Sequence, residues 1–413
     1  MKVVLVNVKF SPNLGDGVIA ECLEDGLRSR IADIEIANCD LAGRTRFGPG
    51  SAMARTIALS ALHSLSDGVK KAAYEPLLAA FVRRRLMPVY AKTIDSADAV
   101  VFGGGQLLED ADLNFPMKVA AAAGVARERD IPMAVFAVGV GRTWSERGAA
   151  LFNEAFAGAE LAAASVRDQL SQTRWRRHFS KTDVEDAQIA FDPGLLARKT
   201  YGAVSDEERT GRNRPKIGLC VTHPTTLRTH YDGGDAPSAE ADTEFFRSLA
   251  RDLAARGMEI VLFTNGAPDD RAFLRRCFPA TVLAGFDKDQ IALAPESRRP
   301  SDLVAIIRDC DGVIAHRLHA NIIAYSYAIP HVGLAMNSKL SEFFALTGRP
   351  DFAVGPEQFK ADIVGDKMAS ALNAPIETDQ HAAILRKADA DLDALADSIR
   401  RAARARRMNG DVR

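Results

Sequence analysis

The chain is poor in the features that would assign it to a specialised class of protein. Its 413 residues include only five cysteines, which are scattered without the Cys-x-x-Cys spacing of zinc or redox sites. Their number is odd and most have apolar neighbours, which argues against a disulfide framework. We therefore expect reduced, buried thiols and a cytoplasmic protein.

The sequence also lacks an excess of charge of either sign. Lys and Arg together number 53 and Asp and Glu 54, so the formal net charge is −1. No global field selects for nucleic acid or acidic polymers, and any anion-binding site must be local. Uninterrupted apolar runs of the ~18 residues that a membrane-spanning helix needs are missing too. The apolar run at the N-terminus is too short for a signal-peptide core, and we expect it to form the first strand.

Short runs rich in Val and Ile are plentiful, by contrast, and alternate with segments of helical length. The first series covers 3–8, 34–38, 99–105, 132–141 and 162–168, and a second series, after the polar stretch 201–215, covers 216–223, 258–266, 311–317 and 330–336. Such alternation predicts parallel sheets, and the chain exceeds the ~250–300 residues of a single core. We predict two Rossmann-like α/β domains, 1–200 and 201–375, and a helical tail at 376–413. This layout resembles the GT-B transferases, whose domains face each other across a cleft.

Residues 43–92 interrupt the first series with a predicted helical insertion. Its basic residues, set among Ala, Leu and Phe, are Arg44, Arg46, Lys70, Lys71, Arg83, Arg84 and Arg85. A solvated insertion explains this pattern, and so does a face that binds an acceptor or a membrane surface. The sequence leaves both interpretations open.

A glycine-rich segment follows the first predicted strand, before a helix expected to begin near Val18. Gly15-Asp16-Gly17 opens a match to the GxGxxA dinucleotide fingerprint, with Asp40 as the possible ribose partner. We reject this interpretation because a longer loop, residues 9–14, separates the glycines from the strand.

What remains at this segment is a loop with backbone donors at a helix N-terminus. Asn13 and Gly15 are candidate ligand contacts there. Asp16 is a candidate general base for a sugar hydroxyl, and a helix cap is the alternative of equal weight.

Glycines also follow two later strands of the first series. They are Gly103, Gly104, Gly105, Gly139 and Gly141, and Arg142 follows the last as a candidate cation. Three glycines in a row let a ligand approach the backbone, and a helix beginning there would offer free N–H groups to an anion. A tight turn without a ligand is the alternative.

Arg167 and Asp168 end the fifth strand of the first series. They form either an internal ion pair or a fork for the donor, because a guanidinium binds carboxylate and phosphate bidentately. Asp192-Pro193 downstream is expected to be a structural turn.

The strongest candidate site lies between Asp311 and Leu334. Gly312 to Ala315 form a short apolar strand, after which His316, Arg317 and His319 enter a helix. Helix N-termini attract anions, and cations placed there oppose the dipole, so an incoming anion is the expected compensation. Capping or solvent-facing roles are the alternative. A His-x-x-His metal pair is disfavoured because no third ligand stands at a suitable spacing.

At this segment the sequence resembles the polysaccharide pyruvyl transferase family, and the resemblance runs over most of the chain. The matching residues are Asn13, Gly15, Asp16, Gly103 to Gly105, residues 139–141, Ser165, Arg167, Asp168, Asp192, Pro193, Arg317 to Ala320, Pro330, Lys339, Phe343 and Gly348. The departures are Ala328-Ile329 where a Gly commonly precedes the Pro, Met336 to Ser338 where an aromatic usually precedes the Lys, and Arg142 after the glycine loop. They leave Arg317 and His319 unchanged and concern the acceptor and the local loops.

The resemblance implies transfer of pyruvate from phosphoenolpyruvate to a sugar, commonly as a ketal, with loss of phosphate. It implies that Arg317 and Arg167 bind the anionic groups of the donor and that His319 binds the donor and acts as an acid. Lys339 would join this anion cluster, and Asp16 would be the base. No cofactor or metal is implied. The acceptor would be a sugar or glycan, and a lipid-linked acceptor would place the enzyme at the inner face of the membrane.

Two other functions stay open. A GT-B glycosyltransferase that uses a nucleotide sugar would have to bind the ribose through Glu342 or Asp302. A non-catalytic sugar-binding relative is the second, and the presence of Arg167, Arg317 and His319 argues against it.

Overall fold

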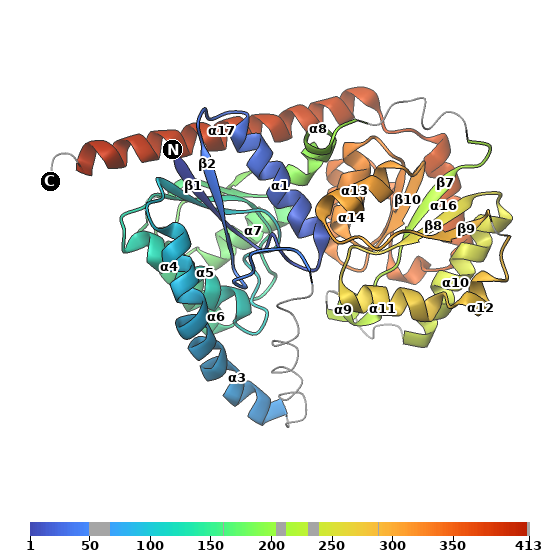
Figure 1. The fold of residues 1–413 in the computed structure, drawn as a ribbon, viewed down its shortest axis with the longest axis horizontal. Coiled ribbons are helices and arrows are strands. Elements are labelled where there is room, and N and C mark those ends of the chain that lie inside the picture. The colour runs from blue at the N-terminus through green and yellow to red at the C-terminus, as the bar shows by residue number, and fades with distance from the viewer. Residues whose placement is uncertain (49–66, 160, 204–211, 230–238, 288, 411–413) are drawn as a thin grey trace. The chain divides into compact units, whose positions relative to one another are not determined.

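The computed structural model describes residues 1–48, 67–159, 161–203, 212–229, 239–287 and 289–410 (Figure 1). The chain divides into two compact units. The first comprises residues 1–11, 19–193 and 388–413, and the second comprises residues 12–18 and 194–387. A short N-terminal segment therefore belongs to the second unit, and the end of the C-terminal helix to the first. Residues 49–66 of the predicted insertion lie outside the described residues.

The first unit contains a parallel sheet in the order β2-β1-β3-β4-β5-β6. Its strands are β1 (Lys2–Asn7), β2 (Glu35–Asp40), β3 (Ala99–Gly103), β4 (Met133–Val138), β5 (Leu161–Val166) and β6 (Gln188–Ile189). Every residue of β3 and β4 is buried, as expected for strands covered by helices on both faces.

The second unit contains a parallel sheet in the order β12-β11-β10-β7-β8-β9. Its strands are β7 (Lys216–Cys220), β8 (Glu259–Phe263), β9 (Ile291–Leu293), β10 (Gly312–Ala315), β11 (His331–Leu334) and β12 (Ala353–Val354). The two sheets confirm the predicted fold class of two Rossmann-like α/β halves.

Helices connect the strands, as parallel pairing requires. In the first unit they are α1 (Leu14–Arg28), whose first turn clusters with the second unit, α3 (Asp67–Phe81), the π-helix η2 (Val82–Leu86), α4 (Met87–Ile94), α5 (Asn114–Arg127), α6 (Glu146–Phe156) and α7 (Gln169–His178). In the second they are α8 (Ala197–Tyr201), α9 (Pro224–Thr229), α10 (Ala239–Ala255), α11 (Pro268–Cys277), α12 (Ala280–Leu283), α13 (Pro300–Arg308), α14 (Leu318–Ser326), α15 (Ser338–Leu346) and α16 (Ala361–Asn373).

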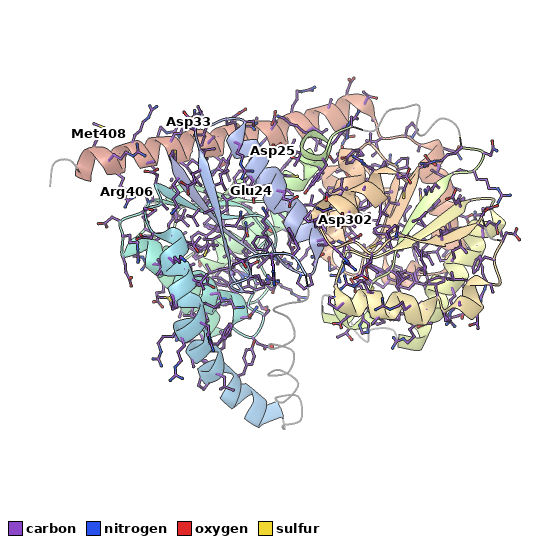
Figure 2. The ribbon with its side chains drawn as sticks, viewed as in Figure 1. Glu24, Asp25, Asp33, Asp302, Arg406 and Met408 are labelled. Carbon is purple, nitrogen blue, oxygen red and sulfur yellow. The ribbon has the colours of Figure 1, made fainter. Side chains whose placement is uncertain are left out.

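The long helix α17 (Thr378–Gly410) forms the predicted helical tail. Its last turns are held to the first unit by arginines, because Arg406 donates to the carbonyls of Ala97 (2.8 Å) and Arg129 (2.9 Å). Figure 2 labels Arg406 on this helix. Arg30, which follows the end of α1, also forms ion pairs with Asp389 and Asp393 of α17.

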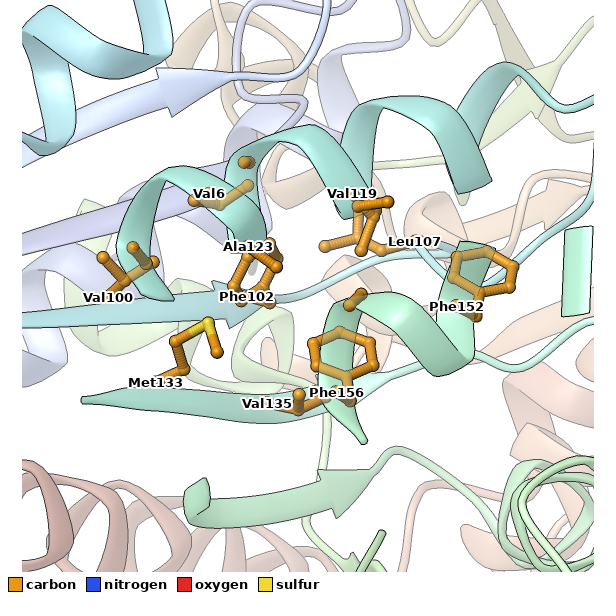
Figure 3. Close-up of a cluster of buried hydrophobic side chains, with 14 of the residues drawn as sticks. Val6, Val100, Phe102, Leu107, Val119, Ala123, Met133, Val135, Phe152 and Phe156 are labelled. Atoms are coloured by element: carbon orange, nitrogen blue, oxygen red, sulfur yellow. The ribbon is translucent and has the colours of Figure 1, made fainter. Parts of the chain in front are cut away.

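The core of the first unit lies between its sheet and helices α5 and α6 (Figure 3). Phe102 of β3 meets Phe156 of α6 edge to face, with ring centroids 5.6 Å apart. Val119 and Ala123 of α5 are fully buried beside them. Small alanines along α5 let this helix approach the sheet closely, which positions the loops that follow β3 and β4.

Two local predictions are wrong. Helix α1 begins at Leu14 rather than near Val18, so Gly15, Asp16 and Gly17 lie in its first turn and not in a loop. No helix begins at Gly105 either; the next one, α5, begins at Asn114. The intervening backbone pairs with the loop after β4 instead, since Gly139 N–H donates to the Gly105 carbonyl (2.8 Å) and Gly141 N–H to that of Leu108 (2.7 Å).

Candidate functional site

The candidate site of the second unit lies at the carboxyl edge of its sheet. Strands β11, β10, β7 and β8 are neighbours, and the loops that follow them meet at this edge. In open α/β sheets ligands bind beyond the carboxyl ends of the strands. The structure places there His223 after β7, Asn265 and Asp270 after β8, the cluster His316 to His319 after β10, and Lys339 after β11.

Arg317 is the residue directly before helix α14. Its backbone is extended (φ −76°, ψ 121°), so its side chain leaves the helix end toward the loops of β7 and β8. Its Nη2 donates to Oδ2 of Asp270, and its Nε is buried without a hydrogen bond to any described residue. A buried carboxylate therefore already neutralises one side of the guanidinium, in addition to the incoming anion that the sequence led us to expect.

Asp270, which the sequence reading missed, joins three loops of the site. It is 1% exposed and lies in the first turn of α11, where a carboxylate favours the helix dipole. Its Oδ1 accepts from the backbone N–H of His223 (2.8 Å), and its Oδ2 accepts from Arg317. A buried ion pair of this kind fixes the positions of the two side chains, because removing one partner leaves the other as an uncompensated buried charge, which is strongly destabilising.

His319 lies in the first turn of α14 and packs against the first turn of α1. A Cβ added at Gly15 would lie 2.5 Å from Cβ of His319 and 2.7 Å from its Nδ1. No side chain fits in that space. Gly15 is therefore needed for the close approach of the two helix ends, which is a physical link between the Asn-x-Gly-Asp and Arg-Leu-His motifs.

The same segment is anchored on the loop after β8. Leu14 N–H donates to the Asn265 carbonyl (2.8 Å), and Nδ2 of Asn265 donates to Oδ1 of Asn13 (3.4 Å). Asp16 is half-buried, and its Oδ1 accepts from Nδ2 of Asn13 (3.3 Å). The structure thus brings Asn13, Gly15 and Asp16 together with the Arg317 and His319 cluster.

His223 is a second residue that the sequence reading missed. Its Nδ1 accepts from the backbone N–H of Thr225 (3.1 Å), so a neutral ring carries its proton on Nε2. The sequence offered a signal for it, because this histidine is the last residue of the predicted strand 216–223. Asp270 and Asn265 gave no such signal, since only the sheet order reveals which loops meet.

His316 has the contacts of a structural residue. Its Nδ1 lies 2.8 Å from the Leu334 carbonyl of the neighbouring strand. Burial, with a smaller effect of the Arg317 charge, lowers the pKa of His316 to about 3 despite this hydrogen bond. Burial likewise lowers the pKa of His331, in β11, to about 4.

These two histidines predict how stability depends on pH. Both folded-state pKa values lie below the ordinary value of about 6.5, so the fold holds the neutral rings. Their contribution is complete above about pH 6.5 and is lost as the pH falls toward 4, at up to about 1.4 kcal/mol per pH unit for each histidine. Urea unfolding at several pH values should show this slope. The same slope in His331→Gln would contradict the assignment.

Lys339 lies in the first turn of α15, at the same sheet edge, and is half-buried. A lysine in the first turn of a helix adds positive charge where the backbone N–H groups point. Its place is consistent with the predicted anion cluster.

The remaining predicted residues lie in the first unit. Side chains of α1 take up the space beside the buried glycines after β3, since a Cβ on Gly103 would lie 2.8 Å from Leu23 and one on Gly104 2.2 Å from Ile19. Gly104 and Gly105 also have positive φ values of 75° and 73°. These glycines are thus required by packing and backbone conformation, which were the alternative to ligand approach.

Arg167 is held inside the first unit. It is 6% exposed; its Nε donates to Asp168 (3.1 Å) and its Nη2 to Oε1 of Gln106 (2.9 Å). A Cβ on Gly139 would lie 2.3 Å from that Gln106 oxygen, so this glycine makes room for the pair. The internal ion pair, one of the two predicted alternatives, is present.

Gly141, Arg142 and Asp40 are the last residues of the first unit that the sequence singled out. A Cβ on Gly141 would lie 2.8 Å from Glu109, so this glycine also serves packing, whereas Arg142 is exposed. The carboxylate of Asp40 is buried and accepts from the backbone N–H groups of Phe10 (3.0 Å) and Ala42 (2.8 Å). These contacts agree with the rejection of Asp40 as a ribose ligand.

Two features are missing from the part of the chain that the structure describes, namely a membrane-spanning helix and a metal-binding cluster. No described helix is both long and apolar enough to cross a bilayer. No group of three or more His, Cys, Asp or Glu side chains is placed to hold a metal ion, as far as the described residues go.

Solved structures of similar fold include sugar-nucleotide enzymes. A Listeria monocytogenes protein assigned as a UDP-N-acetylglucosamine 2-epimerase has a TM-score of 0.56 at 12% identity, covering 96% of this chain and 90% of its own. S. aureus MnaA with UDP has a TM-score of 0.52 at 10% identity (95% and 91%). The UDP-GlcNAc 2-epimerase of Methanocaldococcus jannaschii, with UDP-GlcNAc and UDP, has 0.51 at 12% (93% and 98%). At such identities the likeness shows the fold alone.

Comparison of sequences identifies the family. No curated protein sequence matches the chain. The family model described as polysaccharide pyruvyl transferase, however, matches residues 13–338, from Asn13 to the residue before Lys339. This match includes every loop of the second-unit site up to the start of α15. The chain therefore belongs to the polysaccharide pyruvyl transferase family.

Proposed function

We propose that this protein transfers the pyruvyl group of phosphoenolpyruvate to a sugar of a polysaccharide or its precursor, as a ketal, with release of phosphate. The observation that carries the proposal is the placement of Arg317 and His319 at the N-terminus of α14, braced by Asp270 and by the first turn of α1. A small donor with two anionic groups suits such a site, because backbone N–H groups and a guanidinium both favour carboxylate and phosphate.

The chemistry assigns a role to each of these residues. His319 would protonate C3 of the enol, which leaves an oxocarbenium-like C2. A sugar hydroxyl then adds to C2 and loses its proton to Asp16. A second hydroxyl replaces the phosphate when the C2–O bond to phosphate breaks, which closes the ketal. The departing phosphate takes up the proton of this second hydroxyl, and exchange with solvent returns the proton from Asp16 to His319. Arg317 would stabilise the anionic groups throughout.

The other candidates have supporting roles in this proposal. Lys339 would add a second cation to the donor site. Arg167 would reach a donor only through Nη1, since its other nitrogens bind Asp168 and Gln106. Among the described residues, Arg142 is the exposed cation of the glycine loops, and we assign it to the acceptor. The scheme uses no metal or organic cofactor.

The test is phosphate release from phosphoenolpyruvate in the presence of candidate glycans. We expect release that depends on the acceptor and a mass gain in the product that matches a pyruvate ketal. Calorimetry measures donor binding separately, and a protein that is folded but does not bind phosphoenolpyruvate would rule the proposal out.

A nucleotide-sugar glycosyltransferase is the competing function, favoured only by fold. The carboxylate of Asp302, one of its two candidate ribose ligands, caps α13 by accepting from the N–H groups of Arg298 and Arg299 (both 2.9 Å). Figure 2 labels Asp302. This engagement weakens the alternative. Release of UDP from a UDP-sugar, with no phosphate from phosphoenolpyruvate, would establish it instead.

We also expect the reaction to take place in the cytoplasm. All five cysteines are free and buried, as in proteins that fold under reducing conditions.

A further inference from the structure

The helices of the described insertion carry an exposed face that the proposed chemistry does not use. Helix α3, the π-turn η2 and α4 run consecutively along residues 67–94 (Figure 1). We call the exposed side chains Leu77, Phe81, Arg83, Arg84, Arg85 and Lys92 the basic-apolar face.

A narrow buried stripe holds these helices to the first unit. Its residues are spaced by four through the π-turn and are Leu78, Val82, Leu86, Tyr90 and Ile94, each 8% exposed or less. Only one side of the helices therefore packs on the core. The remaining circumference, where the basic-apolar face lies, is left to solvent.

Two large apolar side chains protrude from this face. Leu77 is 55% exposed and Phe81 is 43% exposed, and they are four residues apart on one side of α3. The other large apolar side chains that are exposed in the described part of the chain, Leu293 and Met408, lie on separate elements. Paired exposed apolar residues on one helix face are costly in water and are typical of a surface that meets a partner.

Unpaired positive charge surrounds them. Arg83, Arg84, Arg85 and Lys92 form no ion pair or side-chain hydrogen bond with the described residues. Nearby Arg147, in contrast, pairs with Glu75 of α3 (3.1 Å). Three positive charges thus gather within about one turn of helix, and an extended negative surface would attract them.

We propose that the basic-apolar face binds the surface of an anionic membrane. Leu77 and Phe81 would enter the interfacial region while the arginines and Lys92 contact lipid phosphates, as amphipathic basic helices do. An extended planar anion suits a face of this length better than a compact ligand. This goes beyond the proposed transfer, which does not require it, and would bring a lipid-linked acceptor within reach.

The test is flotation of the full-length protein with vesicles of phosphatidylcholine alone or mixed with phosphatidylglycerol. We expect binding only to the mixed vesicles. The triple variant Arg83→Glu/Arg84→Glu/Arg85→Glu should bind on the order of 100-fold more weakly, since each basic residue contributes about 1 kcal/mol, a factor of about five, near an anionic surface. Leu77→Ser/Phe81→Ser should also lose binding, because the apolar contact is removed without a change in charge.

A matched variant controls for net charge. Arg214→Glu/Arg401→Glu/Arg404→Glu makes the same charge change at exposed arginines elsewhere and should bind as the unmodified protein does. Circular dichroism checks that every variant is folded. Equal losses in both triple variants, unchanged binding of Leu77→Ser/Phe81→Ser, or no binding of the unmodified protein would each overturn the proposal. Preference for RNA over vesicles would overturn it as well. Vesicle binding needs no donor, so these outcomes leave the proposed transfer untouched.

Discussion

Replacing Arg317 by alanine should lower kcat/KM for phosphoenolpyruvate by on the order of 10³-fold. The change removes the proposed charge pair between Arg317 and the anionic groups of the donor, and the loss of one partner of such a buried, hydrogen-bonded pair costs several kcal/mol. Donor binding, measured by calorimetry, should weaken in parallel. Arg317→Lys should recover only part of the loss, since an ammonium keeps the charge but not the planar fork that matches a carboxylate.

Loss of folding could imitate this result, because the change leaves the Asp270 carboxylate buried without its cation. The double variant Asp270→Asn/Arg317→Ala removes both charges and separates the two causes. We expect it to unfold at a higher urea concentration than Arg317→Ala yet to stay inactive. Recovery of activity together with stability would show that Arg317 only braces the site.

Gly15→Ala should lower kcat by about 100-fold while leaving the fold intact. The added methyl group would lie 2.5 Å from Cβ of His319, so the two helix ends must separate and the imidazole must shift. A displacement of about 1 Å in a catalytic group can cost this much. Steady-state kinetics and thermal unfolding measure the two effects separately.

Helix α5 offers a matched control. Gly124 also lies in a helix, but its added Cβ would meet nothing within 4 Å. Gly124→Ala should therefore keep full activity and gain a little stability, since alanine favours helix more than glycine does. In a His319→Ala background, Gly15→Ala should cost little further activity. Full activity of Gly15→Ala alone would show that the position of His319 is not important.

The sequence predicted the sheets well because their central strands are apolar runs bounded by helical segments. The nine predicted strands all appear, but β6, β9 and β12 were missed. These edge strands contain only two or three residues each, such as Gln188–Ile189, which is too short for any periodicity.

The sequence located the residues that lie together where a motif marks a strand end, and it missed the partners that come from another loop. Arg317 and His319 follow a predicted strand, and the structure places Asn13 and Gly15 beside them. Asp270 carried no signal, because an acidic residue in the first turn of a helix is common and its pairing depends on the order of the strands.

The glycines show a further limit of the sequence. It left ligand approach and a tight turn open for Gly103 and Gly104, and in the structure Leu23 and Ile19 of α1 lie beside these glycines. A glycine shows that something lies close to the backbone, but the sequence does not say whether it is a ligand or a helix.

The membership of residues 12–18 in the second unit has a consequence for how the protein is made. During synthesis, Asn13 and Gly15 leave the ribosome about three hundred residues before Arg317 and His319. The N-terminal segment can therefore take its final place only after the second unit has been made. A gene fragment for residues 194–387 alone would therefore encode the sheet but not the first turn of α1, against which His319 packs. Exchange of donor sites between relatives would have to carry this N-terminal segment along as a second, separate insert.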